Sequence, residues 1–114
     1  VLSLHIPLTK ETKQMVDDEY FFHFKKSIFF INTARGEIVN TSAVLKNIKS
    51  GKILGAGLDV LEAEKFPILA EQPWFEDLKA SGKVMLTPHV GGWTFESYRK
   101  ISEVLAEKLA EMKL

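Results

Sequence analysis

The sequence contains no cysteine, no excess of basic residues and no long apolar run. Without cysteine the chain has no disulfides and no thiolate ligands for a metal ion. The 15 basic residues balance the 15 acidic ones. This argues against a nucleic acid or an anionic membrane as partner, because both attract a basic excess. No segment approaches the roughly 20 apolar residues of a membrane span. We therefore expect a cytoplasmic protein.

Several motifs of common enzyme sites are also absent. The sequence has neither a G-x-G-x-x-G turn nor a Walker A motif for nucleotide phosphates. It has no H-x-x-x-H or H-E-x-x-H spacing, so we expect no metal site. A G-x-S-x-G nucleophile elbow is missing as well, which argues against a hydrolase with a serine nucleophile.

The 114 residues are enough for one domain, and they alternate between apolar and helical segments. We predict strands at residues 1–5, 27–33, 53–60 and 84–87. We predict helices at residues 17–26, 41–49, 74–80 and 94–112. This alternation predicts an α/β fold with a parallel sheet and helices on both of its faces. The consecutive apolar residues of the second strand favour a strand covered on both sides.

Polar residues follow three of the predicted strands. Arg35 follows the second strand, Asp59 lies at the end of the third, and His89 follows the fourth. In parallel α/β sheets, ligands bind just beyond the carboxyl ends of the strands. The pattern therefore predicts one site that combines a fixed cation, a carboxylate and an imidazole.

Each of these residue types can serve a catalytic or binding role, and each also has a plain structural explanation. The planar guanidinium of Arg35 suits a substrate carboxylate, although an arginine in this position is more often an exposed surface residue. His89 can act as a general acid or base, because histidine changes charge near neutral pH. A structural histidine in a turn is at least as common. Glu62 and Glu64 are both placed to orient the imidazole, and their positions alone do not choose between them.

Four segments together resemble the D-isomer-specific 2-hydroxyacid dehydrogenases, the family of D-lactate, phosphoglycerate and formate dehydrogenases. The segments are 4–9 (LHIPLT), 32–36 (NTARG), 57–60 (GLDV) followed by Glu64, and 87–92 (TPHVGG). Their order and spacing also agree with the family, and the resemblance runs through almost the whole chain.

The resemblance implies three catalytic residues. Arg35 is expected to bind the carboxylate of a 2-oxo acid and to polarise its carbonyl group. His89 is expected to exchange a proton with the C2 oxygen. Glu64 is expected to orient and charge the histidine; the family's acid lies five residues after the strand-end aspartate, here Asp59, which selects Glu64 over Glu62.

The resemblance also implies NAD as the cofactor, with NADP not excluded, and a small 2-oxo or 2-hydroxy acid as the substrate. The expected cofactor contacts are His5, Pro7, Thr33, Ala34, Arg35, Asp59, His89, Gly91 and Gly92. The two glycines would let a flat ligand approach the backbone. No metal, nucleic acid or membrane is expected as a partner.

The resemblance covers the second half of a dinucleotide-binding domain, residues 1–114, with residues 94–114 as the helix leading out of it. The family's glycine-rich phosphate loop and substrate domain have no counterpart in this sequence. Two hypotheses follow: the catalytic half of a dehydrogenase that is inactive alone, or a non-catalytic structural or interaction module derived from that family. The edge of the first strand would be open in this chain, so we expect a homo-oligomer such as a dimer.

Overall fold

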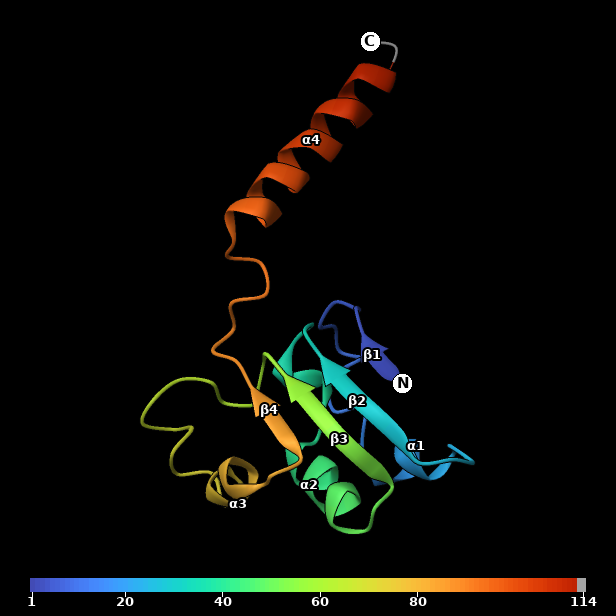
Figure 1. Cartoon of the computed structure of the whole chain (residues 1–114), viewed down its shortest axis with the longest axis vertical. Helices are drawn as coiled ribbons and strands as arrows, with labels where there is room; N and C mark the ends of the chain where they lie inside the picture. Colours follow the sequence, from blue (N-terminus) through green and yellow to red (C-terminus); the bar gives the residue numbers. More distant parts are fainter. Residues whose placement is uncertain (113–114) are drawn as a thin grey trace.

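The computed structural model describes residues 1–112 and contains one four-stranded parallel sheet (Figure 1). Its strands are β1 (Leu2–Leu4), β2 (Ile28–Asn32), β3 (Ile53–Leu58) and β4 (Val84–Leu86), in the order β1-β2-β3-β4. The helices are α1 (Asp18–Phe22), α2 (Thr41–Lys49), α3 (Phe75–Ala80) and α4 (Phe95–Glu111), with a short 3-10 turn at Gly36–Ile38. The α/β, Rossmann-like class is confirmed. Residues 113 and 114, the end of the expected domain, lie outside the described residues.

Side-chain caps start three of the four helices. The side-chain oxygens of Asp17, Asn40 and Thr94 accept hydrogen bonds from the backbone at the starts of α1, α2 and α4. Such caps satisfy N–H groups that have no partner inside the helix. After α2 the chain turns at Gly51, whose φ of +79° lies in the left-handed region. Helix α1 is shorter than the predicted 17–26, because the chain leaves it after Phe22 to enter β2.

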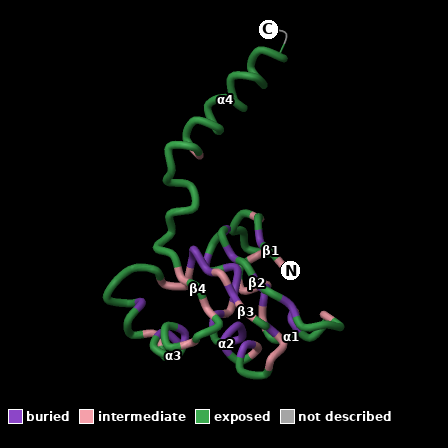
Figure 2. The backbone as a smooth tube through the Cα atoms, viewed as in Figure 1, coloured by how far each residue is buried: buried purple, intermediate pink, exposed green. Residues whose placement is uncertain are grey.

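A single hydrophobic core lies between the sheet and helices α1, α2 and α3. Phe21 of α1 and Phe30 of β2 are fully buried, and their rings pack edge to face with centroids 5.4 Å apart. Leu78 of α3 and Ile53 of β3 are buried in the same cluster. Figure 2 shows the buried residues concentrated in these elements. The core thereby holds the three later strands in register.

The opposite face of the sheet is exposed, which corrects the expectation of helices on both faces. Phe29, Leu54 and Met85 lie on that face and are 52%, 46% and 71% exposed. Each strand is added on the same side of the one before it. Right-handed crossovers then place every connecting helix on one face. The consecutive apolar residues of β2 therefore mark an apolar face that residues 1–112 do not cover.

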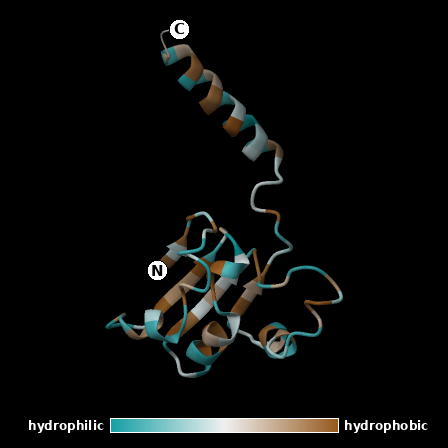
Figure 3. Ribbon diagram, turned by 180° about the vertical axis from the view of Figure 1, so that it is seen from behind, coloured by the Kyte–Doolittle hydropathy of each residue, from teal (hydrophilic) through white to brown (hydrophobic). Residues whose placement is uncertain are grey.

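Helix α4 projects away from the sheet (Figure 1). None of its residues is buried. The apolar side chains predicted along one side of it are exposed: Phe95, Tyr98, Ile101, Leu105 and Leu109. Figure 3 shows apolar and polar residues alternating around this helix. No helix within residues 1–112 is both long enough and apolar enough to span a membrane.

Candidate active site

The ends of β2, β3 and β4 lie at the same edge of the sheet. Asn32 at the end of β2 pairs with Leu58 at the end of β3, and Leu58 pairs with Leu86 at the end of β4. The segments that follow these three residues carry Arg35, the two glutamates and His89, so the parallel register brings them to a common edge. This is the edge at which α/β sheets bind ligands.

The turn that carries Arg35 is shaped by two neighbouring residues. The buried Asn32 side chain accepts a hydrogen bond from the Ala34 N–H at 3.0 Å and donates one to the Arg35 carbonyl at 3.1 Å. A Cβ on Gly36 would lie 2.1 Å from the carbonyl atoms of Leu61, so only glycine lets this turn contact the loop after β3. The Arg35 guanidinium donates to the Ala34 carbonyl at 2.6 Å.

His89 and Glu64 form a hydrogen-bonded pair. His89 Nδ1 lies 2.7 Å from Glu64 Oε2, and the other carboxylate oxygen accepts a hydrogen bond from the Leu61 N–H at 3.1 Å. An ionised carboxylate only accepts, so Nδ1–H is the donor and Nε2 is left for another partner. Both side chains are partly exposed, at 46% for His89 and 36% for Glu64. Glu62 points elsewhere and makes no hydrogen bond to His89.

Asp59 holds the loop that carries the histidine. Its carboxylate accepts hydrogen bonds from the Thr87 hydroxyl at 2.5 Å, the Val90 N–H at 3.0 Å and the Gly91 N–H at 2.9 Å. Burial raises the pKa of Asp59, but these hydrogen bonds and the nearby His89 outweigh it, leaving the pKa below its ordinary value. A Cβ on Gly91 would lie 2.9 Å from the carboxylate, so this approach also requires glycine.

Three cavities adjoin the expected functional residues, and the smallest of them, of about 200 Å³, is lined by Asp59, Glu64 and His89 among others. Arg35, Glu64 and His89 all line a cavity of about 330 Å³. A third cavity, of about 620 Å³ at the ends of β1 and β2, is lined by His5, Ile6, Pro7, Leu8, Thr33, Ala34 and Arg35. The structure thus brings the expected catalytic residues together and gathers five of the expected cofactor contacts in the adjacent cavity. Gly91 and Gly92 line none of these cavities.

The third cavity is the candidate site for part of the expected dinucleotide. It is open to the backbone of the residues after β1 and β2, and Arg35 joins it to the cavity of His89. By the resemblance, residues 33–35 would face the nicotinamide and residues 4–9 the adenine side of such a cofactor. No strand-to-helix turn in the chain has the glycine pattern that grips a pyrophosphate. Among residues 1–112, no three histidine, aspartate or glutamate side chains are grouped to hold a metal ion.

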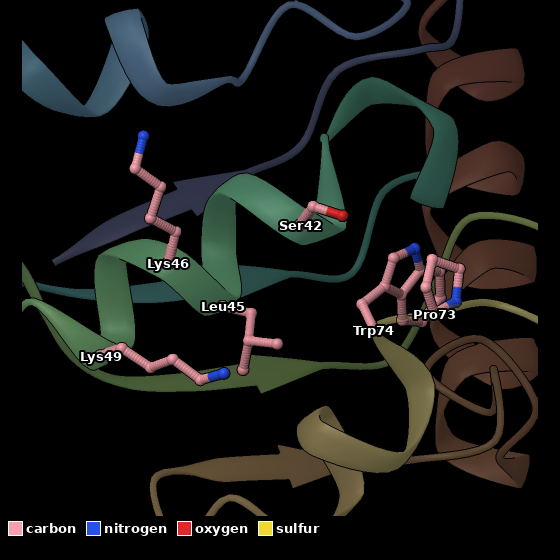
Figure 4. A pocket seen from close by; sticks show the side chains of 6 residues that line it. All are labelled: Ser42, Leu45, Lys46, Lys49, Pro73 and Trp74. Carbon is pink, nitrogen blue, oxygen red and sulfur yellow. The ribbon is translucent and has the colours of Figure 1, made fainter.

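A further hollow of about 320 Å³ lies between α2 and the start of α3 (Figure 4). Lys46 and Lys49 on its rim are each paired with a carboxylate, Asp18 at 2.6 Å and Asp77 at 2.7 Å. None of its lining residues lines any of the three cavities at the strand ends. We assign it no part in the site.

Sequence reasoning missed two supporting residues, Asn32 and Thr87. Asn32 is 1% exposed and occupies an inward position of β2. A buried polar side chain needs hydrogen-bond partners, so a polar residue at the inward end of an apolar strand is the signal that could have identified it. Thr87 has no such signal, because its hydroxyl contact with Asp59 joins residues 28 positions apart.

The parallel sheet, with polar residues at its strand ends, is the arrangement of an α/β protein that binds its ligand beyond the carboxyl ends of the strands. Residues 1–91 match the family described as D-isomer specific 2-hydroxyacid dehydrogenase, NAD binding domain. The chain belongs to this family, and the resemblance stated from its four motifs is confirmed.

Individual relatives show the same likeness. The chain is 40% identical over 111 residues to a glyoxylate reductase of Pyrococcus furiosus, covering 96% of this chain and 31% of that protein. It is 33% identical to D-lactate dehydrogenase with NAD+ from Lactobacillus jensenii, with a TM-score of 0.75 over 92% of this chain and 34% of that one. A 2-hydroxyacid dehydrogenase from Xanthobacter autotrophicus with NADPH is 31% identical, with a TM-score of 0.69 over 98% and 45%. This chain spans about a third of the length of the curated relatives it matches.

Proposed function

We propose that this chain is the catalytic half of an NAD-dependent dehydrogenase that interconverts a small 2-oxo acid and a D-2-hydroxy acid, and that it is inactive alone. The observation that carries the proposal is the His89–Glu64 hydrogen bond in a cavity shared with Arg35. The three groups supply a proton carrier, its orienting carboxylate and a fixed cation. Family membership supports the same chemistry.

Each residue has a distinct role in this proposal. The guanidinium of Arg35 binds the substrate carboxylate through its planar pair of donors and polarises the adjacent carbonyl. His89 donates a proton from Nε2 to the C2 oxygen during reduction and removes it during oxidation. Glu64 accepts the Nδ1–H, which holds the ring orientation and leaves Nε2 toward the substrate. NADH, when bound, supplies the hydride.

We assign the cofactor contacts to the residues at the strand ends. Thr33 and Ala34 would lie along the nicotinamide, and His5 and Pro7 would lie on the adenine side; all four line the cavity at the ends of β1 and β2. Gly91 and Gly92 would allow close approach of a flat ring. Asp59 supports this region through the histidine loop, because both of its carboxylate oxygens already accept hydrogen bonds from that loop.

A chimera tests the activity. The 111-residue segment of the Pyrococcus furiosus glyoxylate reductase that matches this chain is replaced by it, and NADH-dependent reduction of glyoxylate is measured. We expect turnover by the chimera, a loss of at least about 100-fold in kcat in its His89→Gln variant, and no such loss in the control variant His23→Gln. A chimera that folds and binds NADH but does not reduce glyoxylate would contradict the proposed function.

The 114-residue chain is measured beside the chimera. It should show no reduction of glyoxylate or pyruvate with NADH, because no helix N-terminus in it is built to hold the cofactor phosphates. Turnover by the chain alone would contradict its proposed inactivity.

We also place the protein in the cytoplasm, which its lack of cysteine fits.

A second candidate function, a non-catalytic interaction module, is favoured by the exposed apolar surfaces. The outer edge of β1 lies at the end of the sheet, and Phe29, Leu54 and Met85 leave one sheet face apolar. Exposed strand edges and large apolar patches promote association.

We propose that the chain forms a homo-oligomer. Light scattering should show dimers or larger species, and a monomer at high concentration would contradict this.

A further inference from the structure

We propose that Glu62 is a positioning residue that sets the geometry of the Glu64–His89 pair by anchoring the loop after β3. Its carboxylate uses both oxygens. Oε1 accepts a hydrogen bond from the Gln14 side-chain amide at 2.6 Å, and Oε2 accepts one from the Thr41 N–H, also at 2.6 Å. Only its effect on catalysis rests on the proposed function; the anchoring itself is a property of this chain.

The contact with Thr41 is strong for a physical reason. Thr41 is the first residue of α2, so its N–H has no acceptor within the helix. A carboxylate at this end also interacts favourably with the helix dipole, and hydrogen bonds to charged groups are stronger than neutral ones. The side chain of Asn40 accepts from a different N–H, that of Ala43. Glu62 therefore adds to the cap of α2 without replacing it.

The contact with Gln14 connects the loop to a third segment, the one between β1 and α1. Gln14 has a φ of +55°, and its backbone N–H donates to the Glu37 carbonyl at 2.8 Å. Its side-chain amide also reaches the Val39 carbonyl at 3.3 Å. Glu62 thus joins the loop after β3 to the start of α2 and to the connection between β1 and α1.

The backbone between the two glutamates explains how this anchor reaches the histidine. Ala63 has a φ of +53°, a left-handed conformation that turns the chain between them. Glu62 consequently contacts α2, while Glu64 contacts His89. Just before them, Leu61 packs against Gly36, so this end of the loop is held at two adjacent residues.

Freeing Glu62 would release one of these two restraints, and Ala63 alone separates it from Glu64. The left-handed conformation of Ala63 is unfavourable for a residue with a side chain and persists only while its surroundings hold it. Loss of the anchor should therefore let the loop relax and lengthen the contact between Glu64 and His89. A merely structural role would lower the stability of α2 and leave the histidine unchanged.

The test reads the tautomer of His89 directly in the 114-residue chain. Ring ¹⁵N chemical shifts distinguish Nδ1–H from Nε2–H, and they are recorded above the ordinary titration range of histidine. The wild-type chain should favour Nδ1–H, because Glu64 accepts that proton, and Glu64→Ala should favour Nε2–H. In Glu62→Gln, the ratio of Nδ1–H to Nε2–H should fall by about tenfold, the size expected for the loss of one hydrogen bond. Glutamine has a single acceptor oxygen and cannot serve both Gln14 and Thr41.

Two further variants make the result specific. Glu71→Gln changes an exposed glutamate of the same segment and should leave the ratio unchanged. Gln14→Ala removes one of the two contacts and should lower the ratio by a smaller factor. A Glu62→Gln protein that unfolds at lower temperature while keeping the wild-type ratio would overturn the proposal. If Glu62→Gln does not fold, an unchanged ratio in Gln14→Ala overturns it.

The outcome is separable from that of the proposed function. A fall in the ratio together with an inactive chimera would support the positioning role and refute the dehydrogenase assignment. An active chimera together with an unchanged ratio would support the dehydrogenase assignment and refute the positioning role. In an active chimera, Glu62→Gln should lower kcat by about tenfold with little change in the KM for NADH, because neither Glu62 nor Glu64 is among the expected cofactor contacts.

Discussion

Replacing Asp59 by asparagine should loosen the loop that carries His89. The carboxylate accepts three hydrogen bonds, from the hydroxyl of Thr87 and the N–H groups of Val90 and Gly91. The asparagine amide has one acceptor oxygen, and its NH2 group would face at least one backbone N–H. Loss of a hydrogen bond to a charged group costs about 1.5–3 kcal/mol. A central value of about 2 kcal/mol corresponds to about 30-fold in an opening equilibrium.

Amide hydrogen exchange measured by NMR checks this value residue by residue. In Asp59→Asn, the amide of Val90 or Gly91 should exchange about 30-fold faster, because Asp59 is the acceptor for both. The control is Asp77→Asn, which removes a charge from an exposed ion pair with Lys49 and should cost less than about 1 kcal/mol. Unchanged exchange at both amides in Asp59→Asn would refute the argument that this carboxylate holds the loop.

Three further outcomes are expected. Gly36→Ala should lower the free energy of unfolding, measured by calorimetry, by at least about 1–3 kcal/mol, since its Cβ would overlap the Leu61 carbonyl. The control Gly82→Ala has open space around the added Cβ and should leave the free energy of unfolding unchanged. Because the pKa of Asp59 is lowered in the folded chain, the stability it contributes is present above the unfolded value of about 3.9. That contribution is lost as the pH falls through the folded pKa. When stability is measured against pH, Asp59→Asn should not show this loss. In the active chimera, Arg35→Lys should raise the KM for glyoxylate more than the KM for NADH, because an ammonium lacks the planar pair of donors.

Local sequence signals predicted the order and type of the elements. The predicted helices at 17–26 and 94–112 begin at the residues that cap α1 and α4 in the structure, Asp17 and Thr94. The predicted helix at 41–49 matches α2, and the structure shows that the preceding residue, Asn40, caps it. Capping is a contact within three residues, so the local sequence contains most of its determinants.

The coverage of the sheet could not be predicted in the same way. Phe29 and Phe30 are equally apolar in sequence, yet one is 52% exposed and the other fully buried. The difference depends on the order in which the strands pair and on the hand of their connections, neither of which a single apolar strand encodes. An apolar strand shows that both of its faces are apolar, but it does not show whether each face is covered.

The choice between Glu62 and Glu64 has a similar explanation. Both follow the same strand, and by position alone either could face the histidine. The left-handed turn at Ala63 directs the two carboxylates to different partners. Alanine gives no local indication of this conformation, since glycine or asparagine is the usual residue there. The resemblance to the family selected Glu64 where local reasoning did not.

The site also divides its residues into those that face the cavity and those that hold them. Arg35, Glu64 and His89 are exposed, so packing alone does not fix their geometry. Each lies beside a less exposed polar residue that bonds the backbone: Asn32 at the arginine turn, Glu62 at the loop after β3, and Asp59 at the histidine loop. All three supporting side chains extend from or just beyond strands that the core holds in place. Within residues 1–112, helices cover one face of this sheet, and these hydrogen bonds hold the three turns at its edge. Changes in the supporting residues should therefore alter the geometry of the site while the sheet itself stays folded.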